Sequence, residues 1–192
     1  MAEGILLSAL SLLQKTFIDA AKGDREARKE QAQLLNAVAA AVGKLLVGTT
    51  ALYDGLGKDS LRGWNGDIGY WQLFEACTEL EAYFTRTLPG NKTVKRMQEW
   101  ITNIRLHPAA IVSLYESLNA DGTIREEKFE NWEGRYTSIE AANHYRLQYL
   151  GFSNVCRDVQ AVRKELTKIM AELKATAVML ESGTLGKLRP GS

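Results

Sequence analysis

Carboxylate side chains recur at helical spacing in two parts of the chain, a pattern that could hold a metal ion or support acid–base chemistry. They are Glu75, Glu79 and Glu81 in the first part, and Glu133 and Glu140 in the second. A di-iron bundle needs a Glu-x-x-His motif on each of two helices, and neither His107 nor His144 provides one. Because Glu140 and His144 are four residues apart, a surface pair on one helix is the favoured interpretation. We therefore expect neither a metal site nor a cofactor.

The two cysteines, Cys77 and Cys156, are candidates for nucleophilic catalysis. An activated thiol or hydroxyl needs a base such as histidine within reach, and the chain has only two histidines. Both cysteines fall on apolar helical faces, where buried thiols are usually inert. They form no CxxC pair, which argues against a disulfide framework and favours a reducing, cytoplasmic compartment. We expect a protein that is not an enzyme.

The segment 117–128 (SLNADGTIREEK) has the spacing of a calcium-binding loop. Asn119, Asp121 and Thr123 stand at ligand positions, and a glycine follows Asp121 as such loops require. The segment resembles a degenerate EF-hand loop. Its two strongest ligands are missing, because Ser117 replaces the first aspartate and Lys128 replaces the bidentate glutamate at the end. A tight turn followed by a capping box explains the same residues, and we interpret them as a turn that does not bind metal.

The segment from Asp54 to Gly69 carries five glycines, more than a helix would tolerate at about 1 kcal/mol each. Long loops in compact domains are often binding elements, and this one leads into several aromatic and charged side chains. The expected partner-binding loop contains Arg62, Trp64, Asn65, Asp67, Tyr70 and Trp71. The alternative is that its tryptophans fold back to cap one end of the bundle.

A second candidate surface is a basic cluster around the turn at Pro89. It consists of Arg86, Lys92, Lys95 and Arg96, with Trp100 one helical turn further on. Such a cluster could contact phosphates or an acidic partner, and the alternative is an ordinary solvated helix end. The whole chain carries 24 Lys and Arg against 23 Asp and Glu, so no basic excess indicates nucleic-acid binding.

Helical periodicity dominates the whole chain, and no segment alternates in the way that marks β-strands. We predict an all-α bundle of about six helices, with a main loop between the second and third. The expected helices are 3–22, 24–53 with Asp24 as the cap, 70–88, 92–105, 124–150 and 154–182, with a separate or kinked piece at 109–118. The first presents Leu6, Leu10, Leu13, Phe17 and Ala20 as one stripe.

The last expected helix has the cleanest pattern. Its apolar positions alternate by four and three residues in the manner of a coiled-coil seam. They are Val155, Val159, Val162, Leu166, Ile169, Leu173, Thr176 and Leu180. We predict a single domain over 1–183, followed by a flexible or docked tail at 184–192.

These observations favour a non-enzymatic protein–protein interaction or assembly subunit, an adaptor or scaffold that binds another protein or itself. The alternative is a membrane-active effector whose N-terminal apolar helices insert into a bilayer. The apolar stretch 34–52 nearly reaches the roughly 20 residues that span a membrane, but Asn36 and Lys44 interrupt it. A buried core helix is therefore the preferred interpretation of that stretch.

Overall fold

The computed structural model describes residues 3–55, 66–105 and 153–184. Within these ranges the chain forms six helices and no strand. They are α1 (Glu3–Ala20), α2 (Arg25–Gly55), α3 (Gly66–Thr87), α4 (Lys92–Arg105), α7 (Ser153–Ala161) and α8 (Arg163–Ser182). The predicted all-α bundle is confirmed. The helices predicted over 109–118 and 124–150, and the tail from residue 185 onward, lie outside the described residues.

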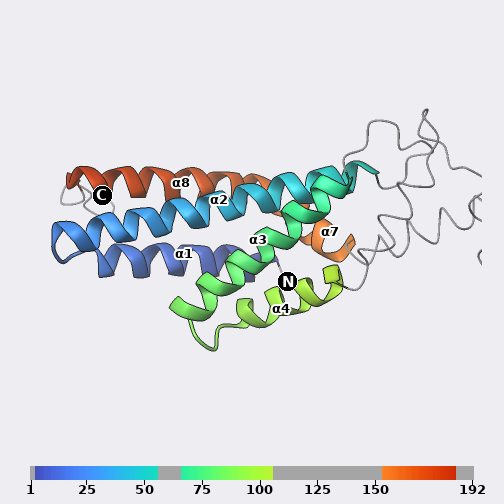
Figure 1. The fold of residues 1–192 in the computed structure, drawn as a ribbon, viewed down its shortest axis with the longest axis horizontal. Helices are drawn as coiled ribbons and strands as arrows, with labels where there is room; N and C mark the ends of the chain where they lie inside the picture. Colours follow the sequence, from blue (N-terminus) through green and yellow to red (C-terminus); the bar gives the residue numbers. More distant parts are fainter. Residues whose placement is uncertain (1–2, 56–65, 106–152, 185–192) are drawn as a thin grey trace, which may run out of the picture.

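Three helices, α1, α2 and α8, lie side by side along the length of the bundle, and α3 crosses them obliquely (Figure 1). The central helix is α2, which contacts α1, α3, α7 and α8. The stretch Arg25–Leu52 is long and apolar enough to cross a membrane by length and composition, and half of its apolar window is buried in the bundle. The apolar stretch 34–52, predicted to be a core helix, belongs to α2, and its Leu35, Val42 and Leu45 are buried.

Capping residues set the ends of the long helices. The Asp24 carboxylate accepts a hydrogen bond from the backbone N–H of Ala27 at 2.8 Å, so Asp24 caps α2 as predicted. At the other end of the chain, α8 stops at Gly183, whose φ of 71° is the left-handed geometry that glycine adopts without strain.

The apolar stripe of α1 faces the core over most of its predicted length. Leu6, Leu10, Leu13 and Phe17 are buried. The prediction for the last position was wrong, because Ala20 is exposed and Ala21 is buried in its place. The helix ends at Ala20, and the chain then turns toward α2.

The glycine-rich segment was predicted to remain a loop as far as Gly69, and this was wrong at its C-terminal end. Helix α3 already begins at Gly66. Packing explains the difference, because a β-carbon at Gly69 would lie only 2.9 Å from the Ala51 β-carbon on α2. Gly69 therefore allows α2 and α3 to approach closely, and the contact between the helices offsets its poor helix propensity.

The helix predicted over 154–182 is two helices in the structure. Val162 separates α7 from α8 with φ of −112° and ψ of 20°, outside regular helical geometry. The apolar seam continues across the break, since Val159, Val162 and Leu166 are all buried. Next to the break, the Gln160 side-chain amide donates hydrogen bonds to the hydroxyls of Thr49 at 3.3 Å and Thr50 at 3.1 Å. This contact ties the end of α7 to α2.

Candidate functional site

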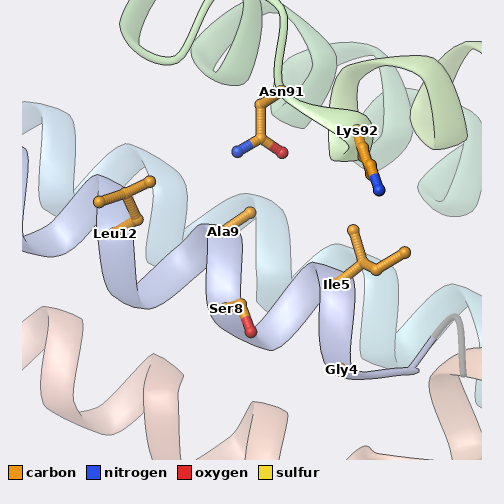
Figure 2. A pocket seen from close by; sticks show the side chains of 7 residues that line it. All are labelled: Gly4, Ile5, Ser8, Ala9, Leu12, Asn91 and Lys92. Carbon is orange, nitrogen blue, oxygen red and sulfur yellow. The ribbon is translucent and has the colours of Figure 1, made fainter.

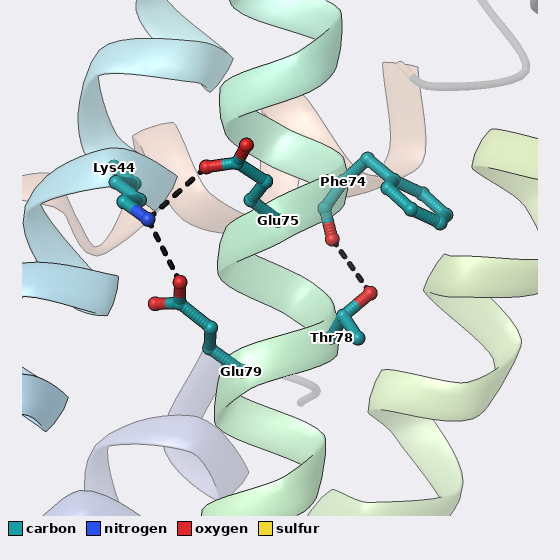
Figure 3. Close-up of polar contacts among 5 residues, drawn as sticks. All are labelled: Lys44, Phe74, Glu75, Thr78 and Glu79. Carbon is teal, nitrogen blue, oxygen red and sulfur yellow. Dashed lines mark hydrogen bonds and ion pairs between the residues drawn. The ribbon is translucent and has the colours of Figure 1, made fainter.

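The carboxylates of α3 meet a lysine from α2. Lys44 Nζ lies 2.7 Å from Glu79 Oε1 and 3.0 Å from Glu75 Oε2 (Figure 3). Lys44 donates a hydrogen bond to each carboxylate, and these bonds, above all the one to Glu79, raise the pKa of Lys44 above its ordinary value. Both carboxylates therefore balance an ammonium group and join two helices.

Among the described residues, no group of three or more His, Cys, Asp or Glu side chains is placed to hold a metal ion. Glu81, the third carboxylate of α3, is half-buried and makes no ion pair with any residue that the structure describes. The other candidates, His107, Glu133, Glu140 and His144, lie outside the described ranges, as do Asn119, Asp121 and Thr123 of the EF-hand-like turn.

The two cysteines, far apart in sequence, are both buried in the core. Burial raises the pKa of the Cys77 thiol well above its usual range, and the nearby Cys156 adds to that effect. Burial also raises the pKa of Cys156 to about 12. Both thiols therefore stay protonated at neutral pH, which disfavours nucleophilic attack because the thiolate is the reactive form.

The predicted partner-binding loop is only partly described. Arg62, Trp64 and Asn65 lie outside the described residues, and Asp67 lies in the first turn of α3. Tyr70 and Trp71 belong to α3 and point to different surroundings. Tyr70 is 4% exposed and belongs to the core, whereas Trp71 is 57% exposed. The structure therefore keeps Trp71 as a surface candidate and removes Tyr70 from that surface.

Aromatic neighbours on the same helix fix the Trp71 ring. Its centroid lies 4.9 Å from that of Tyr70 and 6.3 Å from that of Phe74, and both pairs meet edge to face. This geometry suits the quadrupoles of aromatic rings. The exposed indole is thus held against a buried tyrosine and a half-buried phenylalanine.

The members of the predicted basic cluster have different surroundings in the structure. Arg96 forms ion pairs with Asp158 on α7 and with Glu99, and its guanidinium lies 5.6 Å from the centre of the Trp100 ring. Arg96 therefore joins α4 to α7, and its charge is already balanced within the bundle. The remaining members, Arg86, Lys92 and Lys95, are exposed and make no ion pair with any described residue.

Lys92 helps to line a surface groove between α1 and the turn that leads into α4 (Figure 2). It has a volume of about 380 Å³. Its lining residues are Gly4, Ile5, Ser8, Ala9, Leu12, Asn91 and Lys92. Leu12 is 45% exposed and gives the groove part of its apolar lining.

Sequence reasoning missed the groove, although one signal was present. The run from Ile5 to Leu13 holds more apolar residues than one core-facing stripe requires, and Ile5 and Leu12 fall outside that stripe. The surplus apolar residues line the groove. Lys92, which was identified from the sequence, forms part of its opposite wall.

Two surfaces therefore remain as candidates, one centred on Trp71 and the other on the groove. Both combine apolar side chains with a rigid helical support. No protein-family model, no curated protein and no solved structure matches this chain.

Proposed function

We propose that this chain is a non-enzymatic protein–protein interaction or assembly subunit, an adaptor or scaffold that binds another protein or a second copy of itself. The observation that carries the proposal is the exposure of Trp71. Tryptophan is among the residues that contribute most binding energy at protein interfaces. More than half of this side chain faces solvent, at a position where burial against a partner would gain free energy.

The aromatic contacts that hold the Trp71 ring in place also favour binding. A side chain that is already held by Tyr70 and Phe74 loses little conformational freedom when a partner covers it. The aromatic ring also combines a large apolar area with an N–H donor, which suits a surface that is wet before binding and buried afterwards. Two buried free thiols support a reducing, cytoplasmic location as part of the same proposal.

A photoreactive aromatic amino acid at position 71, whose ring takes the place of the indole, tests this proposal. We expect an adduct whose mass identifies either a second copy of the chain or another protein. The matched control is the same photoreactive residue at Ala171, which is exposed on α8. Equal yields at the two positions, or no adduct at either, would contradict the proposal.

A second candidate function is favoured by one observation, namely that α2 has the length and composition of a membrane span. In this alternative, α1 and α2 leave the bundle and insert into a bilayer. The buried half of α2 would then have to leave the core, which would expose Cys77 and Cys156. Flotation with liposomes, read together with thiol labelling, separates the two functions. If the protein floats with the liposomes and its thiols become labelled, the membrane function replaces the adaptor proposal. We expect neither flotation nor labelling.

A further inference from the structure

The groove between α1 and the start of α4 has a shape and a charge that specify a kind of partner. Resting on the proposed function, and deepening it, we propose that this groove binds an acidic amphipathic helix of a partner protein. The residues of the partner helix that touch α1 would be apolar, and those that face α4 would be Asp or Glu.

The shape of the groove follows the axis of α1. The lining residues Gly4, Ser8 and Leu12 are spaced by four, so they lie along one side of the helix. From the first to the last, this side rises about 12 Å, which accommodates roughly two turns of a second helix. A groove lined at helical spacing suits ridges of side chains that recur every three or four residues.

The floor of the groove is made by a small residue between two larger ones. Ala9 lies between Ile5 and Leu12, and all three side chains extend toward the turn before α4 (Figure 2). Ala9 is already buried, so a large apolar side chain of the partner would rest between the more exposed Ile5 and Leu12. That side chain would also cover Leu12, part of whose apolar surface is now exposed to water.

The width of the groove is fixed by a hydrogen bond. The hydroxyl of buried Thr93 donates to the Ile5 carbonyl oxygen at 3.2 Å, which joins the first turn of α4 to α1. On the same turn, Asn91 uses its side-chain oxygen to accept a hydrogen bond from the Thr93 backbone N–H at 2.9 Å. The groove is thus preorganised, which lowers the entropic cost of binding.

The charge at the groove favours an acidic partner. The lining of the groove includes one cation, Lys92, and no carboxylate. Lys95 lies one turn further along the same side of α4, and neither lysine makes an ion pair with a described residue. An acidic segment of the partner would pair with these two lysines. The concave shape between two helices favours a helix over a flat lipid surface as the occupant.

The test is selection on the intact chain from a displayed library of helical peptides. Apolar positions of the library vary between large and small residues, and the other positions vary among Asp, Glu, Lys, Arg and Ser. We expect the enriched peptides to be amphipathic and acidic, and their binding to weaken as salt is added. Enrichment of basic peptides, or of no class at all, would overturn the inference.

Four variants locate the binding site of the selected peptides. Lys92→Glu and Leu12→Ser should each raise the Kd about tenfold or more. The matched controls, Lys174→Glu and Val178→Ser, make the same changes at exposed positions on α8 and should leave the Kd unchanged. Equal effects in the test and control variants would overturn the inference. Loss of folding is not expected in Lys92→Glu, because an acidic residue suits the first turn of a helix.

A blocking variant provides an independent measurement. A β-carbon at Gly4 would meet no atom within 4 Å, so the bundle leaves room for a Gly4→Leu side chain to begin beside the groove. Weaker peptide binding with an unchanged melting temperature is expected, and unchanged binding would count against the groove as the site.

Two further measurements separate this inference from its alternatives. Trp71 lies sixteen residues, or about 24 Å, before the end of α3 at Thr87, so Trp71→Ala should leave peptide binding intact. If no peptide is enriched while the residue at position 71 still crosslinks to a partner, the inference about the groove is overturned and the proposed function is not. Co-flotation with vesicles of phosphatidylcholine and phosphatidylserine that depends on Lys92, without peptide enrichment, would replace the helix by an anionic membrane surface.

Discussion

Gly48 on α2 lies directly against Gly69 on α3, and a β-carbon at Gly48 would come within 2.7 Å of the Gly69 carbonyl oxygen. It would also come within 2.7 Å of the Leu73 backbone nitrogen. Backbone atoms cannot move aside in the way that a flexible side chain can. The crossing of the two helices therefore depends on the absence of a side chain at this position.

Gly48→Ala should lower the free energy of unfolding by about 1–3 kcal/mol, because the added methyl group forces α2 and α3 apart. The matched control is Gly43→Ala on the same helix, where the nearest atom to the new β-carbon is the Met170 sulfur at 3.5 Å. Alanine has the higher helix propensity, so the control should be unchanged or more stable by about 1 kcal/mol. Urea unfolding followed by circular dichroism measures both. Equal stability of the two variants would contradict the described crossing.

Leu166→Ala should destabilise the bundle by about 2–5 kcal/mol through lost burial and an unfilled cavity, because Leu166 is fully buried in the seam of α8. The same truncation at Val178, which is 62% exposed on that helix, should change stability by less than about 0.5 kcal/mol. Thermal unfolding of the two variants provides the comparison. A neutral Leu166→Ala would show that the seam does not face the core.

The two thiols should be unreactive toward Ellman's reagent in the folded protein at mildly alkaline pH. Both thiols are buried, so the reagent cannot reach them. Burial also raises the pKa of Cys156 to about 12, so little of the reactive thiolate forms. In denaturant both cysteines should react at once. Rapid reaction of either thiol without denaturant would contradict the described core.

The contact of Lys44 with Glu79 and Glu75 should make stability depend on alkaline pH. The pKa of Lys44 is raised in the folded state, so its contribution is fully present below the ordinary value of 10.5 and is lost as pH rises through the higher folded value. The effect is small because the side chain is partly exposed. Lys44→Met should reduce the fall in stability above that pH, and Lys174→Met, an exposed control, should not. Identical pH profiles for wild type and Lys44→Met would contradict this role.

Helix positions could be predicted from the sequence because they depend on local signals. The helix Lys92–Arg105 was predicted with both of its bounds, since Pro89 and Gly90 precede it and Met97 and Ile101 recur at helical spacing. The capping role of Asp24 followed from its residue type and its place before an apolar run. These features need no knowledge of the rest of the fold.

Tertiary contacts decided the features that the sequence could not reveal. The helical start of α3 depends on Gly48 and Ala51 of another helix, which no local pattern near Gly69 encodes. Arg96 was assigned to a surface cluster because Asp158, its partner, is 62 residues away. The groove likewise requires α1 and α4 to be placed side by side, which periodicity alone does not establish.

The central claim is tested most directly by the affinity of the chain for the protein that crosslinks to position 71. Trp71→Ala should weaken that affinity roughly thirtyfold or more, as the loss of a main interface residue does. Its melting temperature should stay near that of the wild type, because Trp71 is largely exposed, whereas Tyr70→Ala should be destabilised by about 3 kcal/mol or more. Unchanged affinity in Trp71→Ala, or a loss of stability as large as that of Tyr70→Ala, would contradict the proposal that Trp71 forms a protein-binding surface.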